Sequence, residues 1–276
     1  MKTLFFGTSE FAVPSLRVVA QRTQCAGAVT QPDRPAGRGQ RLSPTPVKAA
    51  ALELGLHVYE PQRLRAFAAE IAGERFDLFV LASYGRILPA ELLALPRLGS
   101  LNVHPSLLPK YRGATPIQSA ILHGERTTGV SIMLMDAGLD TGDVAIARAV
   151  DIEPEESYGE LHDRLAATGA ELLGEALDAA RRGELQAQPQ RGEATLTRPI
   201  GRDDLHVDWS WAPERIARTV RAYSPRPAAR AEIDGSVVKL LRAHVADGKL
   251  VLDELVAPNR GRMSGEAYLR GRSGRS

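Results

Sequence analysis

The sequence predicts an α/β protein with a mostly parallel sheet, followed by a smaller β-rich domain. Short apolar runs alternate with helical patterns over residues 1–150, an order typical of a parallel sheet covered on both faces. A long amphipathic stretch and a polar, turn-rich segment precede the strand-like runs at the end of the chain. We therefore expect a first domain over residues 1–183, a linker over 184–206 and a small barrel-like domain over 207–276.

The first domain takes its strands from short apolar runs and its helices from the amphipathic stretches between them. Pro46 and Gly55 lie near the start and just past the end of one helical stretch, as helix boundaries favour. The predicted strands are 4–7, 25–30, 56–60, 76–83, 98–104, 127–135 and 143–152. The predicted helices are 11–21, 46–55, 64–73 and 157–182.

The last domain begins with a helical pattern over 212–223, which ends at the proline-rich stretch SPRPA. Three strand-like runs follow, and the Asp-Gly pairs at 234–235 and 247–248 separate them. Asp-Gly between alternating apolar residues is typical of a tight β-hairpin turn. The sequence thus predicts a small antiparallel sheet or barrel behind one helix.

Composition excludes several classes of protein. Hydrophobic residues make up 43% and charged residues 25% of the 276 residues, as in ordinary globular proteins. The single cysteine, Cys25, excludes an internal disulfide and a cysteine-based zinc site, and it agrees with a reducing compartment. No apolar run approaches the roughly 20 residues of a membrane span. We expect a cytoplasmic protein without a membrane partner.

Charge is unevenly distributed along the chain. Residues 208–276 contain 13 Lys+Arg and 8 Asp+Glu, a net charge of +5, whereas the whole chain carries +2. A basic C-terminal region behind a mildly acidic first part indicates a polyanionic partner, and a solvated arginine-rich surface is the alternative.

Asn102 and His104 are the first candidates for catalysis. They are two residues apart at the end of an apolar strand, so their side chains point to the same side. Asn and His together can polarise a carbonyl and stabilise the oxyanion that forms on it. Taken alone, the pair is better explained as a strand cap and a hydrogen-bonded loop histidine, and the catalytic interpretation depends on the segments around it.

A second candidate region is the glycine-rich turn over 135–147, which contains Asp136, Asp140 and Asp143. If strands 98–104 and 127–135 are neighbours, Asp140 can reach His104, raise its pKa, hold its tautomer or accept a proton. A magnesium site on the three aspartates is a weaker hypothesis, because such residues are common in ordinary turns. The histidines are scattered, and we predict no metal.

The segment 31–48 is a third candidate, because a loop of this length within an α/β unit is often functional. Its cations suit phosphate contacts, and a surface insertion without function is the alternative. They are Arg34, Arg38, Arg41 and Lys48. The chain has no G-x-G-x-x-G, Walker A, G-x-S-x-G or H-E-x-x-H pattern.

Taken together, these segments resemble the methionyl-tRNA formyltransferases, which use 10-formyltetrahydrofolate. The motifs that carry the resemblance are FFGTSEFAVPSL, QPDRPAGRG, SPTPVK, ASYGRILP, LNVHPSLLPKYRGATPIQ, MDAGLDTGDV and RAYSPRPAA. The resemblance covers most of the chain. It implies a Rossmann-like formyltransferase fold with an OB-like C-terminal barrel, and an enzyme that formylates initiator methionyl-tRNA. A monomer is a separate expectation, which no sequence motif decides.

The resemblance also assigns roles to residues. The catalytic set of the family falls on Asn102, His104 and Asp140, and Arg38 matches the main arginine of a loop that reaches the acceptor end of the tRNA. Arg34, Arg41 and Lys48 belong to the same loop. The expected folate-binding residues are Ser106, Leu107, Leu108 and Pro109, with backbone from Tyr84, Gly85, Arg86, Ile87 and Leu88.

Two alternatives remain at this stage, and one departure from the family pattern concerns the last domain. An amino-sugar-nucleotide formyltransferase would share the catalytic set, and an RNA-binding protein without catalysis would keep only the basic region. After 242–248 the chain lacks about two strands that family members usually have, so we expect a short barrel, and the sequence leaves its closure open.

Overall fold

The structure is a computed structural model that describes residues 1–36 and 41–273. It divides into two compact units that are discontinuous in sequence. The first unit comprises Met1–Gly113, Gly129–Val150 and Asp163–Leu196, and the second comprises Ala114–Thr128, Asp151–His162 and Thr197–Ser276. The predicted linker segment therefore contributes residues up to Leu196 to the first unit, while the domain boundaries at 183 and 206 stay a prediction.

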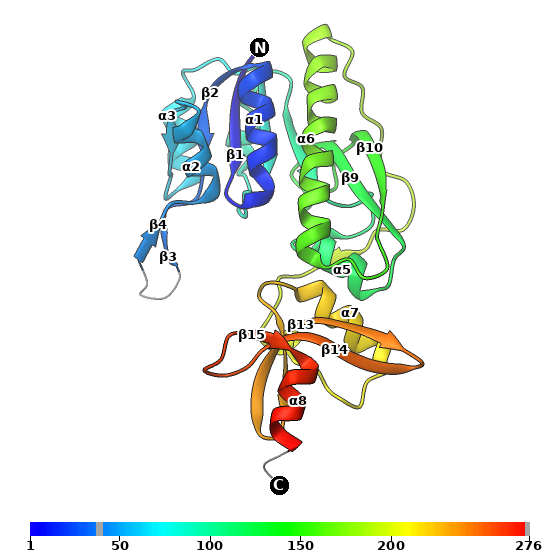
Figure 1. Ribbon diagram of the computed structural model, residues 1–276. Coiled ribbons are helices and arrows are strands. Elements are labelled where there is room, and N and C mark those ends of the chain that lie inside the picture. The colour runs from blue at the N-terminus through cyan, green and yellow to red at the C-terminus, as the bar shows by residue number, and fades with distance from the viewer. Residues whose placement is uncertain (37–40, 274–276) are drawn as a thin grey trace. The chain divides into compact units, whose positions relative to one another are not determined.

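A seven-stranded sheet forms the centre of the first unit (Figure 1). Its strands, in spatial order, are β10 (Val144–Asp151), β9 (Thr127–Leu134), β7 (Ser100–His104), β6 (Leu78–Ala82), β1 (Lys2–Gly7), β2 (Gln24–Val29) and β5 (Val58–Tyr59). Neighbours from β5 to β7 are parallel, and β9 runs antiparallel to β7. The prediction of a mostly parallel sheet is confirmed.

Helices and a short 3-10 turn separate these strands along the chain. They are η1 (Glu10–Ala12), α1 (Val13–Arg22), α2 (Pro46–Glu53), α3 (Leu64–Ile71), α4 (Ala90–Leu93) and α6 (Tyr158–Arg182). Alternate residues Leu4 and Phe6 of β1 form one cluster with Phe79 of β6 and with α3 and α4. Gly169 of α6 packs so closely on β7 that a Cβ there would lie 2.7 Å from Val103.

The segment 31–48 contains a short hairpin, where the sequence indicated only a loop. Strands β3 (Arg34–Ala36) and β4 (Arg41–Ser43) pair in antiparallel register, and the intervening residues 37–40 lie outside the described part. The Thr30 and Thr45 hydroxyls, 2.7 Å apart, join the two ends of the segment. The hairpin thus begins and ends on a fixed base at β2 and α2.

The second unit is built on a four-stranded antiparallel sheet in the order β12 (Ala229–Ile233), β13 (Ser236–Ala246), β14 (Lys249–Val256) and β15 (Arg262–Ser264). The two predicted Asp-Gly pairs form its first hairpin turns, with positive φ at both residues of each. The sheet is accompanied by α5 (Pro116–Leu122), the 3-10 turn η2 (Asp203–Leu205), α7 (Pro213–Tyr223) and α8 (Gly265–Ser273). Two further short strands, β8 (Arg112–Gly113) and β11 (Leu196–Thr197), pair with each other and form a separate two-stranded sheet.

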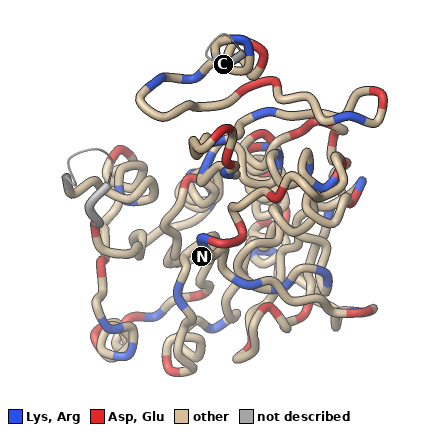
Figure 2. The backbone as a smooth tube through the Cα atoms, turned by 90° about the horizontal axis from the view of Figure 1, so that it is seen from below, with Lys and Arg blue, Asp and Glu red and all other residues tan. Residues whose placement is uncertain are grey.

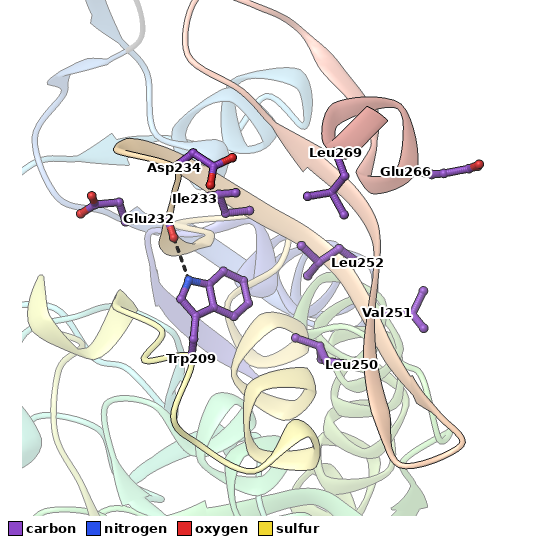
Figure 3. Close-up of a pocket in the computed structure, with 9 residues that line it drawn as sticks. All are labelled: Trp209, Glu232, Ile233, Asp234, Leu250, Val251, Leu252, Glu266 and Leu269. Carbon is purple, nitrogen blue, oxygen red and sulfur yellow. Dashed lines mark hydrogen bonds between the residues drawn. The ribbon is translucent and has the colours of Figure 1, made fainter. Parts of the chain in front are cut away.

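A pocket lies against this sheet, lined by residues of β12, β14 and α8 together with Trp209 (Figure 3). Leu250, Leu252 and Leu269 line it, and the half-exposed indole of Trp209 donates a hydrogen bond of 2.7 Å to the carbonyl of Glu232. Among the described residues, β12 and β15 do not pair, so the sheet stays open. The sequence left a barrel and an open sheet as alternatives, and the described residues form the open sheet.

Candidate active site

Asn102 and His104 lie on β7 at the edge where three parallel strands end. β7 pairs with β6, and β6 pairs with β1, so the loops after Gly7, Ala82 and His104 leave from the same edge of the sheet. In open α/β sheets this carboxyl edge is where ligands bind. His104 is 4% exposed, whereas Asn102 is half-buried.

Asp140 reaches these two side chains by a route that the sequence did not predict. Because β9 is antiparallel to β7, its last residues lie beside Ser100, at the far end of β7 from His104. The turn that follows folds back over β7 and places Asp140 near both side chains. The Asp140 carboxylate lies 3.5 Å from the Asn102 amide nitrogen and 3.6 Å from His104 Nδ1.

The backbone around Asp140 fixes this turn. Asp140 has a φ of +51°, which costs a non-glycine residue about 1 kcal/mol. Gly142 has no room for a side chain, because a Cβ would lie 1.7 Å from the Leu134 carbonyl oxygen. The Gly113 N–H donates a 2.8 Å hydrogen bond to the Asp140 carboxylate and holds it in place.

The tautomer of His104 follows from its hydrogen bonds. Nε2 lies 3.0 Å from the carbonyl oxygen of Tyr111, which can only accept, so Nε2 carries a proton. Nδ1 then faces Asp140 as the nitrogen that can gain or lose a proton. Burial lowers the pKa of His104 below its ordinary value, and Asp140 and the Tyr111 carbonyl oppose this only in part.

The structure adds to the sequence interpretation of His104 in two respects. Asp140 does act to raise the pKa of His104, but the cost of burying a charged imidazole is larger, and the net direction is downward. The tautomer is set by the Tyr111 carbonyl and not by Asp140. Neutral His104 with an unprotonated Nδ1 is thus the form that the fold favours.

The predicted folate segment Ser106–Pro109 follows β7 directly and is tied to β9. The Ser131 hydroxyl donates to the Ser106 carbonyl at 2.8 Å and accepts from the Leu108 N–H at 3.2 Å. The Ser106 hydroxyl donates to the Lys110 carbonyl at 2.6 Å. The loop beside His104 is therefore held in one conformation from both ends.

The second predicted folate segment, 84–88, follows the neighbouring strand β6. Tyr84 and Leu88 are buried in the core, so only their backbone is available to a ligand, while Ile87 is 82% exposed. The Tyr84 carbonyl accepts hydrogen bonds from Thr8 and from Gln31. A surface hollow of about 560 Å³ lies beside this segment and is lined by Arg63, Leu64, Arg65, Arg86, Ile87 and Pro89.

Three of the predicted tRNA-binding residues are described by the structure, and they lie on the β3–β4 hairpin and at its base. Arg34 and Arg41 are in the two strands, and Arg38 lies outside the described residues. Lys48, in α2, forms ion pairs of 2.8 Å with Asp33 and with Glu60. These two carboxylates raise the pKa of Lys48 and neutralise its charge, so the geometry favours a role in anchoring the hairpin.

The three aspartates of the 135–147 turn do not form a metal-binding group. Asp136 accepts hydrogen bonds from the Gly138 N–H and the Thr141 hydroxyl, which is ordinary turn chemistry. Within residues 1–36 and 41–273, no three His, Cys, Asp or Glu side chains are grouped as metal ligands would be. In the same residues no helix is both long and apolar enough to cross a membrane.

Comparison with known proteins places the chain in a family. A family of proteins described as formyl transferase matches residues 1–177, and the family of the formyl transferase C-terminal domain matches residues 199–250. A methionyl-tRNA formyltransferase of Geobacter metallireducens is 39% identical over 297 aligned positions, which cover 98% of this chain and 96% of that protein. The chain belongs to the methionyl-tRNA formyltransferase family. A second relative, from Xanthomonas campestris, is 46% identical over 90% of this chain and 82% of its own length.

Solved structures of formyltransferases share the fold. A methionyl-tRNA formyltransferase from Clostridium thermocellum has a TM-score of 0.63 at 16% identity, over 94% of this chain and all of that chain. An N-formyltransferase from Helicobacter canadensis, in complex with folinic acid and dTDP-3-aminofucose, has a TM-score of 0.69 at 18% identity, over 95% of this chain and 96% of that chain. At these identities the likeness concerns the fold, and it agrees with the formyltransferase architecture of the family.

The structure also brings groups to the site that sequence analysis missed. The Tyr111 carbonyl contacts His104, and the Gly113 N–H contacts the Asp140 carboxylate. The side chain of Gln190 contacts the backbone carbonyl of Asp140. Tyr111 and Gly113 lie in a segment that the motif already contained. Gln190 has no such signal, because it is in the polar segment predicted as a linker and lies 50 residues from Asp140.

Proposed function

We propose that this chain transfers the formyl group of 10-formyltetrahydrofolate to the α-amine of initiator methionyl-tRNA. Its catalytic residues in this proposal are Asn102, His104 and Asp140. The observation that carries this proposal is the meeting of these three side chains at the carboxyl edge of the sheet, with the Asp140 carboxylate within 3.6 Å of both Asn102 and His104. The names of relatives up to 46% identical over most of the chain support the same reaction.

The reaction joins the amine nitrogen to the formyl carbon and breaks the bond from that carbon to N10 of the folate. The carbonyl oxygen becomes an oxyanion in the tetrahedral intermediate, one proton leaves the amine, and one proton is delivered to N10. The Asn102 amide N–H can donate to the oxyanion without any change of charge. Because Asn102 shares its face of β7 with His104, both groups can contact the same formyl group.

His104 and Asp140 handle the proton in this scheme. Neutral His104 presents an unprotonated Nδ1, which accepts the proton of the attacking amine. The resulting imidazolium is stabilised by the Asp140 carboxylate 3.6 Å away, and it can return the proton to N10 as the intermediate collapses. The Tyr111 carbonyl keeps Nε2 protonated throughout, so Nδ1 is the nitrogen that takes part.

Folate binding is proposed at the loops that leave the same edge. The segments 106–109 and 84–88 follow β7 and β6, the strands nearest the catalytic side chains. The arginines beside the second segment, Arg63 and Arg65, suit the carboxylates of a folate tail. The proposed co-substrate requires no metal.

The acceptor is proposed from the cations of the hairpin and of the second unit. Figure 2 marks acidic and basic residues along the chain, and several basic residues of the second unit are paired, such as Arg242 with Glu160 and Arg262 with Glu254. Other cations of this unit form no ion pair within the described residues and are exposed. They are Arg226, Arg230, Lys239, Lys249 and Arg260. Such free cations suit a phosphate backbone.

A formyl-transfer assay with three acceptors tests the proposal. The purified chain is given 10-formyltetrahydrofolate with initiator methionyl-tRNA, with elongator methionyl-tRNA, or with an amino-sugar nucleotide. We expect formylation of the initiator tRNA, less of the elongator form and none of the sugar. Turnover of the sugar nucleotide alone would transfer the assignment to the amino-sugar enzymes, and no turnover would favour an RNA-binding protein.

The proposed location is the cytoplasm, and the proposed state is a monomer. The single half-buried cysteine agrees with a reducing compartment. Size-exclusion chromatography with light scattering checks the second statement, because a monomer has a mass of 29.8 kDa.

A further inference from the structure

The polar segment after α6 returns to the active site and forms hydrogen bonds with two of its segments. The backbone of Gln188 forms two hydrogen bonds with Val144, of 2.9 and 3.0 Å, just after the catalytic turn. Further along, Thr195 accepts hydrogen bonds from the N–H groups of Tyr111 and Arg112. The segment 188–195 thus joins the turn that carries Asp140 to the segment that contacts His104.

Gln190 makes the central connection with a single side chain. Its amide nitrogen donates hydrogen bonds of 2.8 Å to the carbonyls of Asp140 and of Gly142. Its amide oxygen accepts from the Arg112 guanidinium at 2.7 and 3.1 Å. The Gln190 amide therefore makes four hydrogen bonds, two as donor and two as acceptor. They connect the turn that contains Asp140 with the segment that contains Arg112.

The contacts act on the conformation of Asp140 in particular. Asp140 has a positive φ, which is unfavourable for an aspartate without outside support. A donor held at the Asp140 carbonyl favours this backbone conformation, and the Gly113 N–H, next to Arg112, fixes the carboxylate itself. Gln190 therefore connects the backbone of Asp140 with Arg112, the residue before Gly113. Through these contacts it helps to fix the distance between the Asp140 carboxylate and His104.

We propose that Gln190 is a positioning residue for catalysis, which holds Asp140 at its working distance from His104 and Asn102 by donating to the backbone of the catalytic turn. The residue has no contact with the reacting atoms. This inference rests on the proposed function, and it assigns the segment 188–195 a part in the site besides that of a connection between domains.

Gln190→Ala and Gln190→Glu separate this role from others. Gln190→Glu keeps the size of the side chain and can still accept from Arg112, but its ionised carboxylate cannot donate to the two carbonyls. The matched control is Gln186→Ala, the same substitution at an exposed glutamine just before the segment 188–195. Each variant is assayed for kcat and for the KM of both substrates, and its thermal unfolding is measured.

We expect both Gln190 variants to lose about tenfold or more in kcat, because small displacements of catalytic groups are costly, while the KM values and the control stay near wild type. Wild-type activity in Gln190→Glu would overturn the inference, because this variant keeps the contact to Arg112 and lacks the hydrogen bonds to the two carbonyls of the turn. A loss confined to KM, or kinetics like those of the control, would overturn it too. If Gln190→Ala does not fold, the same criteria apply to Gln190→Glu.

Inactivity of the wild-type chain and the Gln186→Ala control towards methionyl-tRNA would instead count against the proposed function. The two failures are therefore distinguishable within one set of assays. Turnover by wild type and control, with a reduced kcat in both Gln190 variants, is the result that establishes the inference.

Discussion

Asp140→Asn removes one negative charge from the proposed site and leaves the shape of the side chain nearly unchanged. The carboxylate lies 3.6 Å from His104 Nδ1. With an effective dielectric constant of roughly 20, a full charge pair at this distance is worth about 4.6 kcal/mol, an upper limit for its effect on the imidazolium. That limit corresponds to a rate factor of about 2,000.

The substituted amide retains part of this interaction, so the expected loss is smaller than the limit. An asparagine oxygen can still accept from the Gly113 N–H, but its NH2 group would then face the Asn102 amide nitrogen, and both are donors. We expect the rate constant of formyl transfer to fall about 10²–10³-fold, with the affinity for the folate almost unchanged.

The assay is single-turnover formylation of initiator methionyl-tRNA, which measures chemistry without product release. Asp143→Asn is the matched control, because Asp143 is an exposed aspartate of the same turn. It should react like wild type. A rate for Asp140→Asn within a few-fold of this control would refute the assignment of Asp140 to proton handling.

Three further predictions concern other parts of the chain. Gly142→Ala should lower the free energy of unfolding by at least about 2 kcal/mol, because its Cβ would meet the Leu134 carbonyl oxygen at 1.7 Å; urea unfolding measures this, and Gly73→Ala, with open space around it, should be neutral. His244→Asn should lower the unfolding temperature at pH 5.5 but not at pH 9. The Asp253 carboxylate raises the pKa of His244, so the stabilisation from this pair is present at low pH and is lost as the pH rises through the raised pKa. A change in unfolding temperature that is independent of pH would contradict this. Arg38→Ala should lower kcat/KM for methionyl-tRNA and spare the KM of the folate; an increased folate KM would place this loop in the folate site.

Local sequence signals predicted most of the architecture. Apolar runs located the strands of the central sheet, and Pro46 and Gly55 marked the ends of α2 to within two residues. The two Asp-Gly pairs predicted hairpin turns that the structure contains. These predictions succeed because helix ends, strand periodicity and tight turns depend on residues that are close in sequence.

The direction of β9 was beyond such signals. Strand 127–134 has the same apolar character as the parallel strands beside it, and nothing local distinguishes an antiparallel neighbour of β7 from a parallel one. The hairpin within 31–48 was missed for a related reason, because its two strands are only three residues long and rich in proline and arginine.

By itself the sequence determined the fold class, the family and the three side chains of the proposed catalytic set, since each is carried by a short motif. Only the tertiary structure decided how they work together. Asp140 reaches His104 because its turn folds back from an antiparallel strand, and the carbonyl of Tyr111 selects the tautomer. The side chain of Gln190 contacts this turn from 50 residues away. Burial, which lowers the pKa of His104, depends on the whole surrounding fold and therefore has no signature in any one segment.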